Sequence, residues 1–184
     1  IENCSFEENS AKVKIISHSQ HDYNSPCHNI RLPITFMDSA FNRYETMIID
    51  NGTREEHNFS LPFTPVAAFL DFDEEFFDLT TDSYKFISSP GNYEFKNSYF
   101  KANVTACQDS ILLRPTLHWI GENEETTIEG VNRFSQKHYW TIEGVNLDKA
   151  DIDAKFYFKI SFSERDFDNT LLQDYAAKDS LMLF

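Results

Sequence analysis

The chain has 184 residues, with 16 Lys and Arg against 30 Asp and Glu, so its formal net charge is 16 − 30 = −14. This charge argues against nucleic acid and anionic membrane as partners, because phosphate binding needs clustered Lys and Arg, and no apolar run reaches the roughly 20 residues that a membrane-inserted helix requires. Aromatic residues make up 15% of the chain, including 18 Phe, which excludes a disordered acidic protein.

The first half of the chain predicts short β-strands, because polar and apolar residues alternate in runs separated by turn residues. Residues 11–17 (AKVKIIS) alternate with Lys outward and Val and Ile inward. The run 30–37 (IRLPITFM) follows, and its Pro33 predicts an edge strand or a bulge. The runs 44–50 and 55–61 flank Asn51-Gly52, which favours a β-hairpin.

Two further segments complete this half. Residues 63–72 (FTPVAAFLDF) indicate a more buried strand, and the short Phe-rich stretch 73–78 is the only plausible helix. Ser88-Ser89-Pro90-Gly91 then marks the expected domain boundary.

The second half repeats the pattern. Strands are expected at 99–105, 110–120, 133–145 and 154–162, with a polar acidic loop at 121–130. We therefore predict an all-β protein of two consecutive small antiparallel β-sandwich (Ig-like) domains, residues 1–89 and 90–184. The chain stops on the apolar run 181–184, so we expect the second domain to be truncated and the chain to be a piece of a longer protein.

The three cysteines, Cys4, Cys27 and Cys107, are widely spaced and form no CxxC pair, which argues against structural zinc. A Cys4–Cys27 bridge fits an exported protein, and three buried thiols fit equally well.

Catalytic signatures such as HExxH, GxSxG and Gly-rich phosphate loops are missing from the sequence. Three groups of residues nevertheless have metal-binding chemistry. They are His18, His21 and His28 with Asp22; the acidic run Asp71, Asp73, Glu74, Glu75 and Asp78; and Asp148, Asp151 and Asp153. Their spacing favours solvated loops and capped turns over metal sites, so we assign no catalytic, cofactor-binding or metal residue.

The aromatic pairs His118-Trp119 and Tyr139-Trp140 suit sugar stacking or a protein interface where they are exposed. On a strand, one member of each pair must point inward, so we expect at least one Trp in the core. Asn-x-Ser/Thr sequons occur at Asn3, Asn51, Asn58 and Asn103, as chance also allows, and they matter only in a eukaryotic secretory protein.

Several segments resemble the C-terminal region of secreted bacterial zinc aminopeptidases of the gluzincin, membrane-alanyl-aminopeptidase type. They are 130–144 (GVNRFSQKHYWTIEG), 154–157 (AKFY), 168–172 (DNTLL), 179–183 (DSLML), Leu117-His118-Trp119 and the stretch 65–82. In that family a β-sandwich follows the catalytic domain. The family's zinc ligands have no counterpart here, and 129–132 (EGVN) lacks the Met-Glu core of its substrate-amine motif.

The resemblance implies a non-catalytic accessory region that supports a zinc-containing catalytic domain lying N-terminal to Ile1, in an exported or cell-envelope protein. The catalytic domain of the same chain is then the main partner. A free-standing extracellular module that binds carbohydrate or protein is the alternative. A hydrolase that uses an Asp/Glu pair is a third hypothesis.

Overall fold

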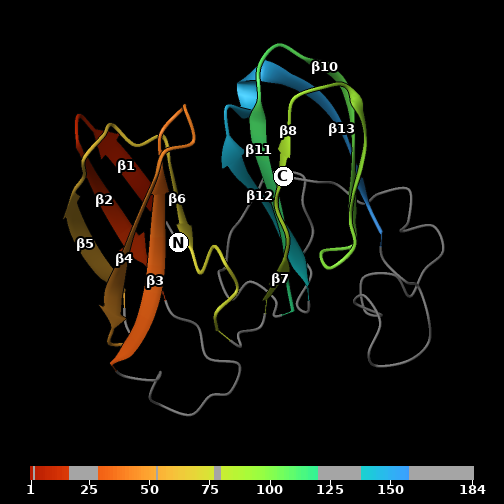
Figure 1. The fold of residues 1–184 in the computed structure, drawn as a ribbon. Coiled ribbons are helices and arrows are strands. Elements are labelled where there is room, and N and C mark those ends of the chain that lie inside the picture. The colour runs from red at the N-terminus through yellow and green to blue at the C-terminus, as the bar shows by residue number, and fades with distance from the viewer. Residues whose placement is uncertain (2, 17–28, 53, 77–79, 120–137, 158–184) are drawn as a thin grey trace, which may run out of the picture. The chain divides into compact units, whose positions relative to one another are not determined.

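The computed structural model describes residues 1, 3–16, 29–52, 54–76, 80–119 and 138–157, and these residues form the all-β protein that the sequence predicts (Figure 1). The short 3-10 turn η1 (Leu147–Lys149) is the one helical element in these ranges. Within this part of the chain no helix has the length and apolar character needed to span a membrane. The chain divides into two compact units, Ile1–Phe77 with Gly144–Asn146 and Asp78–Glu143 with Leu147–Phe184.

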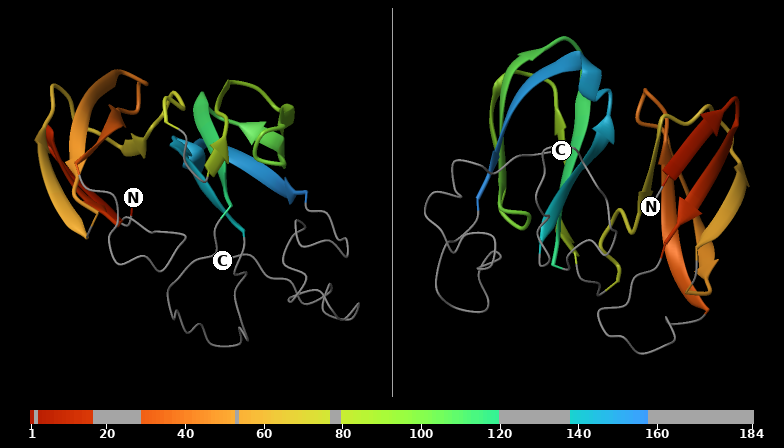
Figure 2. Two further views of the ribbon diagram at one scale, coloured as in Figure 1. Left: turned by 90° about the horizontal axis from the view of Figure 1, so that it is seen from below. Right: turned by 180° about the vertical axis from the view of Figure 1, so that it is seen from behind.

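The first unit is a sandwich of two antiparallel sheets (Figure 2). One sheet has the order β1 (Asn3–Glu7), β2 (Ser10–Ile15), β5 (Glu55–Ser60), and the other has the order β4 (Arg43–Asp50), β3 (Ile30–Met37), β6 (Ala67–Leu70). The two sheets share one core, because alternate side chains of each turn inward. Its buried members are Ala11, Val13, Ile15, Ile34, Phe36, Ile48 and Leu61.

The second unit has the same two-layer plan. Its first sheet has the order β13 (Ala150–Phe156), β10 (Phe100–Cys107), β9 (Gly91–Phe95), and its second has the order β12 (Tyr139–Val145), β11 (Ile111–His118), β7 (Thr80–Asp82). Strand β8 (Lys85–Ile87) also pairs with β11, at the end opposite to β7. The buried core comprises Ile87, Phe95, Phe100, Ala102, Val104, Ile111 and Leu113.

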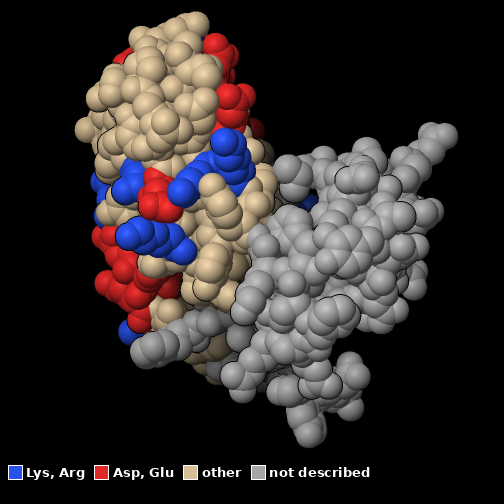
Figure 3. All heavy atoms as spheres, turned by 90° about the vertical axis from the view of Figure 1, so that its right-hand side faces the viewer, with Lys and Arg blue, Asp and Glu red and all other residues tan. Residues whose placement is uncertain are grey.

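In each unit, one sheet has an outer face made of polar side chains. On β1-β2-β5 these are Asn3, Ser5, Glu7, Ser10, Lys12, Lys14, Glu56, Asn58 and Ser60, and on β13-β10-β9 they are Asn92, Glu94, Lys101, Asn103, Thr105, Asp151, Asp153 and Lys155. Figure 3 looks at the second unit and shows basic and acidic side chains next to one another. Among the described residues of these strands, the outward side chains are exposed or partly exposed and predominantly polar.

The prediction of a hairpin at Asn51-Gly52 is wrong. Strand β4 pairs with β3 and strand β5 pairs with β2, so the turn carries the chain from one sheet to the other. Gly52 has a φ of 79°, and its amide donates to Asp50 Oδ1 at 3.0 Å. Turn chemistry fixes the local reversal, whereas the buried face of each strand selects its partner.

The division between the units differs from the expected boundary at Pro90. Strands β7 and β8 precede Pro90 but pair with β11, and the units meet in sequence between Phe77 and Asp78. Ser88 to Gly91 is therefore a turn inside the second unit, because a Pro-Gly signal marks any tight reversal and not only a linker.

Strand β3 is central in its sheet, contrary to the edge position that Pro33 predicts. The pairing with β6 covers Ile34 to Met37 and stops before Pro33, whose carbonyl accepts a hydrogen bond from the amide of Asp71. Proline has no amide hydrogen to continue that ladder. The buried strand expected at 63–72 is accordingly short, since β6 covers only Ala67–Leu70, and the described part of 73–78 forms no helix.

Candidate functional site

A pocket of about 190 Å³ opens on the outer face of sheet β4-β3-β6. Residues from β3, β4 and the turn after β6 line it: Pro33, Thr35, Glu45, Thr46, Met47, Phe72, Asp73 and Glu75. Its walls combine carboxylates with apolar atoms, and Met47 is 50% exposed. All of these residues belong to the first unit, so the pocket is complete within one sandwich.

The turn after β6 places two of the three pocket carboxylates. Asp71 begins it with a φ of 44°, and its carboxylate accepts hydrogen bonds from the amides of Glu75 at 2.7 Å and Phe76 at 3.0 Å. Phe72 follows, is 2% exposed, and packs against Phe69 at a ring distance of 5.2 Å. The hydrogen bonds of Asp71 and the packing of Phe72 fix the turn, so Asp73 and Glu75 are held at the pocket.

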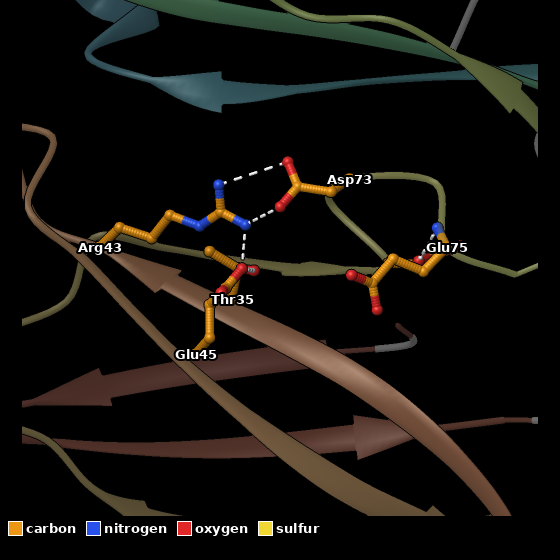
Figure 4. A network of polar contacts seen from close by, with 6 residues as sticks. Thr35, Arg43, Glu45, Asp73 and Glu75 are labelled. Carbon is orange, nitrogen blue, oxygen red and sulfur yellow. Dashed lines mark hydrogen bonds and ion pairs between the residues drawn. The ribbon is translucent and has the colours of Figure 1, made fainter.

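Arg43 joins the turn to strand β4. Figure 4 shows its guanidinium between Asp73 and Glu45. One guanidinium nitrogen bonds Asp73 Oδ1 at 3.3 Å, and the other contacts both Asp73 Oδ2 and Glu45 Oε1. The guanidinium carbon also lies 4.9 Å from the centre of the Phe72 ring, a cation–π arrangement.

Strand β3 holds Glu45 from the other side, because the hydroxyl of buried Thr35 donates to Glu45 Oε1 at 3.2 Å. Each acidic partner of Arg43 is therefore held by two contacts. Glu45 contacts Thr35 and Arg43, and Asp73 contacts both terminal nitrogens of the guanidinium. Such carboxylates lose little conformational freedom when a ligand binds.

The pocket has a negative formal charge. Glu45, Asp73 and Glu75 contribute −3 and Arg43 contributes +1, which leaves −2. Within the described residues, the Glu75 carboxylate has no hydrogen bond or ion pair, so it is the acid left for a ligand. The arrangement suits a cationic group on an apolar stem, with the charge at Glu75 and the stem on Met47 and Pro33.

A second arginine cluster lies on β11 of the second unit. Arg114 forms an ion pair with Asp82, and both residues are buried, at 5% and 2% exposure. Its Nη1 lies 3.7 Å from Glu143 Oε2. Burial raises the pKa of the Glu143 carboxyl above its ordinary value, against the lowering effect of Arg114. Because Asp82 is enclosed, this cluster is not presented to a substrate.

The two tryptophans differ in exposure, and neither belongs to the fully buried core in which at least one was expected. The indole N–H of Trp140 donates to the carbonyl of Ser98 at 2.8 Å and its ring packs on Phe156, and the side chain is partly buried. Trp119 is 37% exposed, its indole N–H donates to the Thr81 hydroxyl at 3.0 Å, and Tyr99 meets it edge-on.

The histidine and tyrosine of these two pairs face each other. The rings of His118 and Tyr139 stack at 4.0 Å, and His118 Nε2 lies 3.0 Å from the Thr141 hydroxyl. They join neighbouring strands β11 and β12.

The metal-binding candidates fall into three groups with different outcomes. His18, His21, His28 and Asp22 lie outside the described residues, as does Asp78. The other residues of the acidic run have separate structural roles: Asp71 accepts hydrogen bonds from the turn, and Asp73 pairs with Arg43. Among the described residues no group of three His, Cys, Asp or Glu side chains has the arrangement of a metal site.

The third acidic group is dispersed along the chain that enters β13. Asp148 pairs with Lys149 in η1, and Asp153 accepts a hydrogen bond from Asn103 at 3.1 Å. Asp151 lies on the same outer face of β13. These residues act as a turn and a solvated strand face.

Cys27 lies outside the described residues, so the Cys4–Cys27 bridge stays a prediction. The Cys107 thiol is directed to backbone carbonyls, 2.9 Å from Asp109 O and 3.8 Å from Ile87 O.

Sequence reasoning did not find Arg43, Glu45, Thr35 or Met47. Asp73 is 30 positions from Arg43, and nothing local in either segment indicates that they meet. The signal for Arg114 was present, since a lone arginine within ILLRPTLHWI stands in an otherwise apolar strand.

Comparison with protein-family models, with curated proteins and with solved structures gives no significant match. The resemblance to gluzincin aminopeptidases accordingly stays a prediction.

Proposed function

We propose that this chain is a non-catalytic binding module whose first unit takes a cationic side chain of a partner protein in the acidic pocket. One observation carries the proposal: the pocket holds three carboxylates against one guanidinium, and Glu75 is the acid without a partner among the described residues. Lys and Arg side chains have the matching form, a charged head on an apolar stem.

The apolar lining supports a side chain over a free cation. Met47 is half exposed beside Pro33, and a methylene stem covering them removes apolar surface from water. The polar outer face of sheet β1-β2-β5 lacks any such surface.

The test uses two probes that differ only in the charge of one side chain, acetyl-Gly-Lys-Gly-amide and its norleucine analogue. Saturation-transfer NMR should detect the lysine probe and give a much weaker signal for norleucine. Glu75→Gln should weaken lysine binding about three- to fivefold, the effect of one exposed ion pair. Added salt should weaken it further.

Glu8→Gln is the matched control, because Glu8 is an exposed acid of the same unit in the turn between β1 and β2. It changes the net charge by the same amount away from the pocket. Equal weakening by both variants, or equal signals from both probes, would contradict the proposal.

A scaffold role beside the catalytic domain of a zinc aminopeptidase is a second proposal, and the sequence resemblance alone supports it. It implies a non-catalytic chain and an exported location. It predicts that the chain forms a stable complex with a separately produced gluzincin catalytic domain, which gel filtration of the mixture would detect.

A carbohydrate ligand is favoured by one observation in the second unit. Trp119 is exposed and its ring is held in place by the hydrogen bond to Thr81. Stacking of a sugar on this ring should change tryptophan fluorescence when an oligosaccharide panel is added, and Trp119→Ala should abolish the change. No change with any oligosaccharide would reject this ligand class.

A further inference from the structure

Three of the four sequons lie on described strands, in a common orientation. In Asn3-Cys4-Ser5 and Asn58-Phe59-Ser60 the middle residue packs against the core of the first unit. In Asn103-Val104-Thr105 the middle residue, Val104, is 1% exposed in the core of the second unit. Since side chains alternate along a strand, each Asn and its hydroxyl partner lie on the outer face.

The faces that carry them are the two polar ones. Asn58 lies opposite Lys12 and Asn3 lies opposite Lys14, so the two asparagines belong to one outer face of sheet β1-β2-β5. Asn103 is on the central strand of β13-β10-β9, between Asn92 and Asp153. A large hydrophilic group attached to either face would replace bound water and would not disrupt any apolar contact of the core.

We propose that Asn3, Asn58 and Asn103 are N-glycosylation sites, and that glycans cover one outer face of each sandwich. The glycan donor is a lipid-pyrophosphate-linked oligosaccharide. The Asn amide nitrogen forms a bond to the anomeric carbon of the sugar, the bond from that carbon to the pyrophosphate oxygen breaks, the nitrogen loses a proton, and the lipid pyrophosphate leaves. Transfer precedes folding, so the fold decides only whether the attached glycan is tolerated.

This placement has a consequence for the first unit. Its glycans sit on sheet β1-β2-β5, whereas the pocket opens on the outer face of β4-β3-β6, the other layer of the same sandwich. Glycosylation therefore leaves the pocket open.

The experiment secretes the chain from a eukaryotic cell line behind a cleavable signal peptide. Treatment with peptide N-glycosidase should lower its mass and convert Asn3, Asn58 and Asn103 to Asp, which peptide mass spectrometry detects. Ser5→Ala, Ser60→Ala and Thr105→Ala should each remove one glycan while the asparagine stays. Asn92→Gln, on the same face as Asn103 but outside any sequon, should remove none.

Unmodified asparagine at these three sites in the folded, secreted chain would overturn the proposal. If the chain is retained in the cell, the same enzyme treatment applies to the retained chain. Its glycans are also released by peptide N-glycosidase, so modified and unmodified asparagines are still distinguished. The lysine probe should bind the glycosylated and the deglycosylated chain equally. Probe binding that appears only after deglycosylation would show that the glycans block the pocket, against the separation of the two faces. Absence of binding in both forms would contradict the proposed function of the pocket and leave the glycosylation result unaffected.

Discussion

The two arginine clusters use the same chemistry in opposite surroundings. Arg43 holds Glu45 and Asp73, with side chains that are 31%, 52% and 43% exposed. Arg114 holds Asp82, and those side chains are 6% and 3% exposed, with Glu143 at the margin at 37%. Each cluster has one guanidinium and two carboxylates, so burial is the main difference between them.

Burial decides what such a cluster can contribute. An exposed ion pair adds roughly 0–1 kcal/mol to stability, and its charges remain available to a ligand. A buried pair gains little over an apolar replacement, but loss of one partner leaves a charge without compensation and costs about 3–5 kcal/mol. We therefore propose a binding role for the Arg43 cluster and a role in specifying the fold for the Arg114 cluster.

The largest expected effect comes from Arg114→Met. The substitution leaves the buried carboxylate of Asp82 without its cation, so the free energy of unfolding of the second unit should fall by about 3–5 kcal/mol. Arg43→Met, the matched change in the exposed cluster, should cost about 1 kcal/mol or less. Urea unfolding monitored by tryptophan fluorescence measures the first change directly, because both tryptophans lie in the second unit.

Far-ultraviolet circular dichroism reports the unfolding of both units and supplies the Arg43 value. Adding Asp82→Asn to Arg114→Met should recover part of the loss, because the buried charge is then removed. An equal loss of unfolding free energy for Arg114→Met and Arg43→Met would contradict the claim that burial distinguishes the two clusters.

An intermediate effect is expected from Asp71→Ala. The variant loses the acceptor of two backbone amides in the turn that positions Glu75, at a cost of about 1–2 kcal/mol to the first unit. Because the turn also orders the pocket, binding of the lysine probe should weaken together with stability. Thermal unfolding and the probe titration test both, and a loss of stability with unchanged probe binding would show that the turn does not organise the pocket.

The smallest effect is a pH dependence at Glu143. A carboxyl whose pKa is raised by folding stabilises the fold below the pKa of the unfolded chain, and this contribution is lost as pH rises through the folded pKa. Gln does not titrate, so the stability of Glu143→Gln relative to the parent should increase from acidic to neutral pH. Urea midpoints of both chains across this range measure the difference. A pH-independent difference would argue against a raised pKa.

The sequence predicts the strands well because alternation reports a physical property of each strand, the burial of one face. The run 30–37 matches β3 at both ends, and Lys12 and Lys14 point outward as expected. The choice of partner strand depends on residues far apart in the sequence. The Asn51-Gly52 turn therefore predicts a hairpin of β4 and β5, whereas these strands belong to different sheets.

The pocket was beyond sequence reasoning for a related reason. The acidic run after β6 has three separate roles in the folded protein: Asp71 in the turn, Asp73 with Arg43, and Glu75 at the pocket. Composition treats these residues as one cluster of like charges. Only the φ of 44° at Asp71 and the contact with β4 separate them.

The most direct test of the division between binding and fold is an NMR titration of the ¹⁵N-labelled chain with acetyl-Gly-Lys-Gly-amide. We expect the amide signals of Thr35, Glu45, Met47 and Glu75 to shift, and those around Arg114 to stay in place. Absence of shifts at the pocket, or shifts centred on Arg114, Asp82 and Glu143, would contradict the assignment of the exposed cluster to ligand binding.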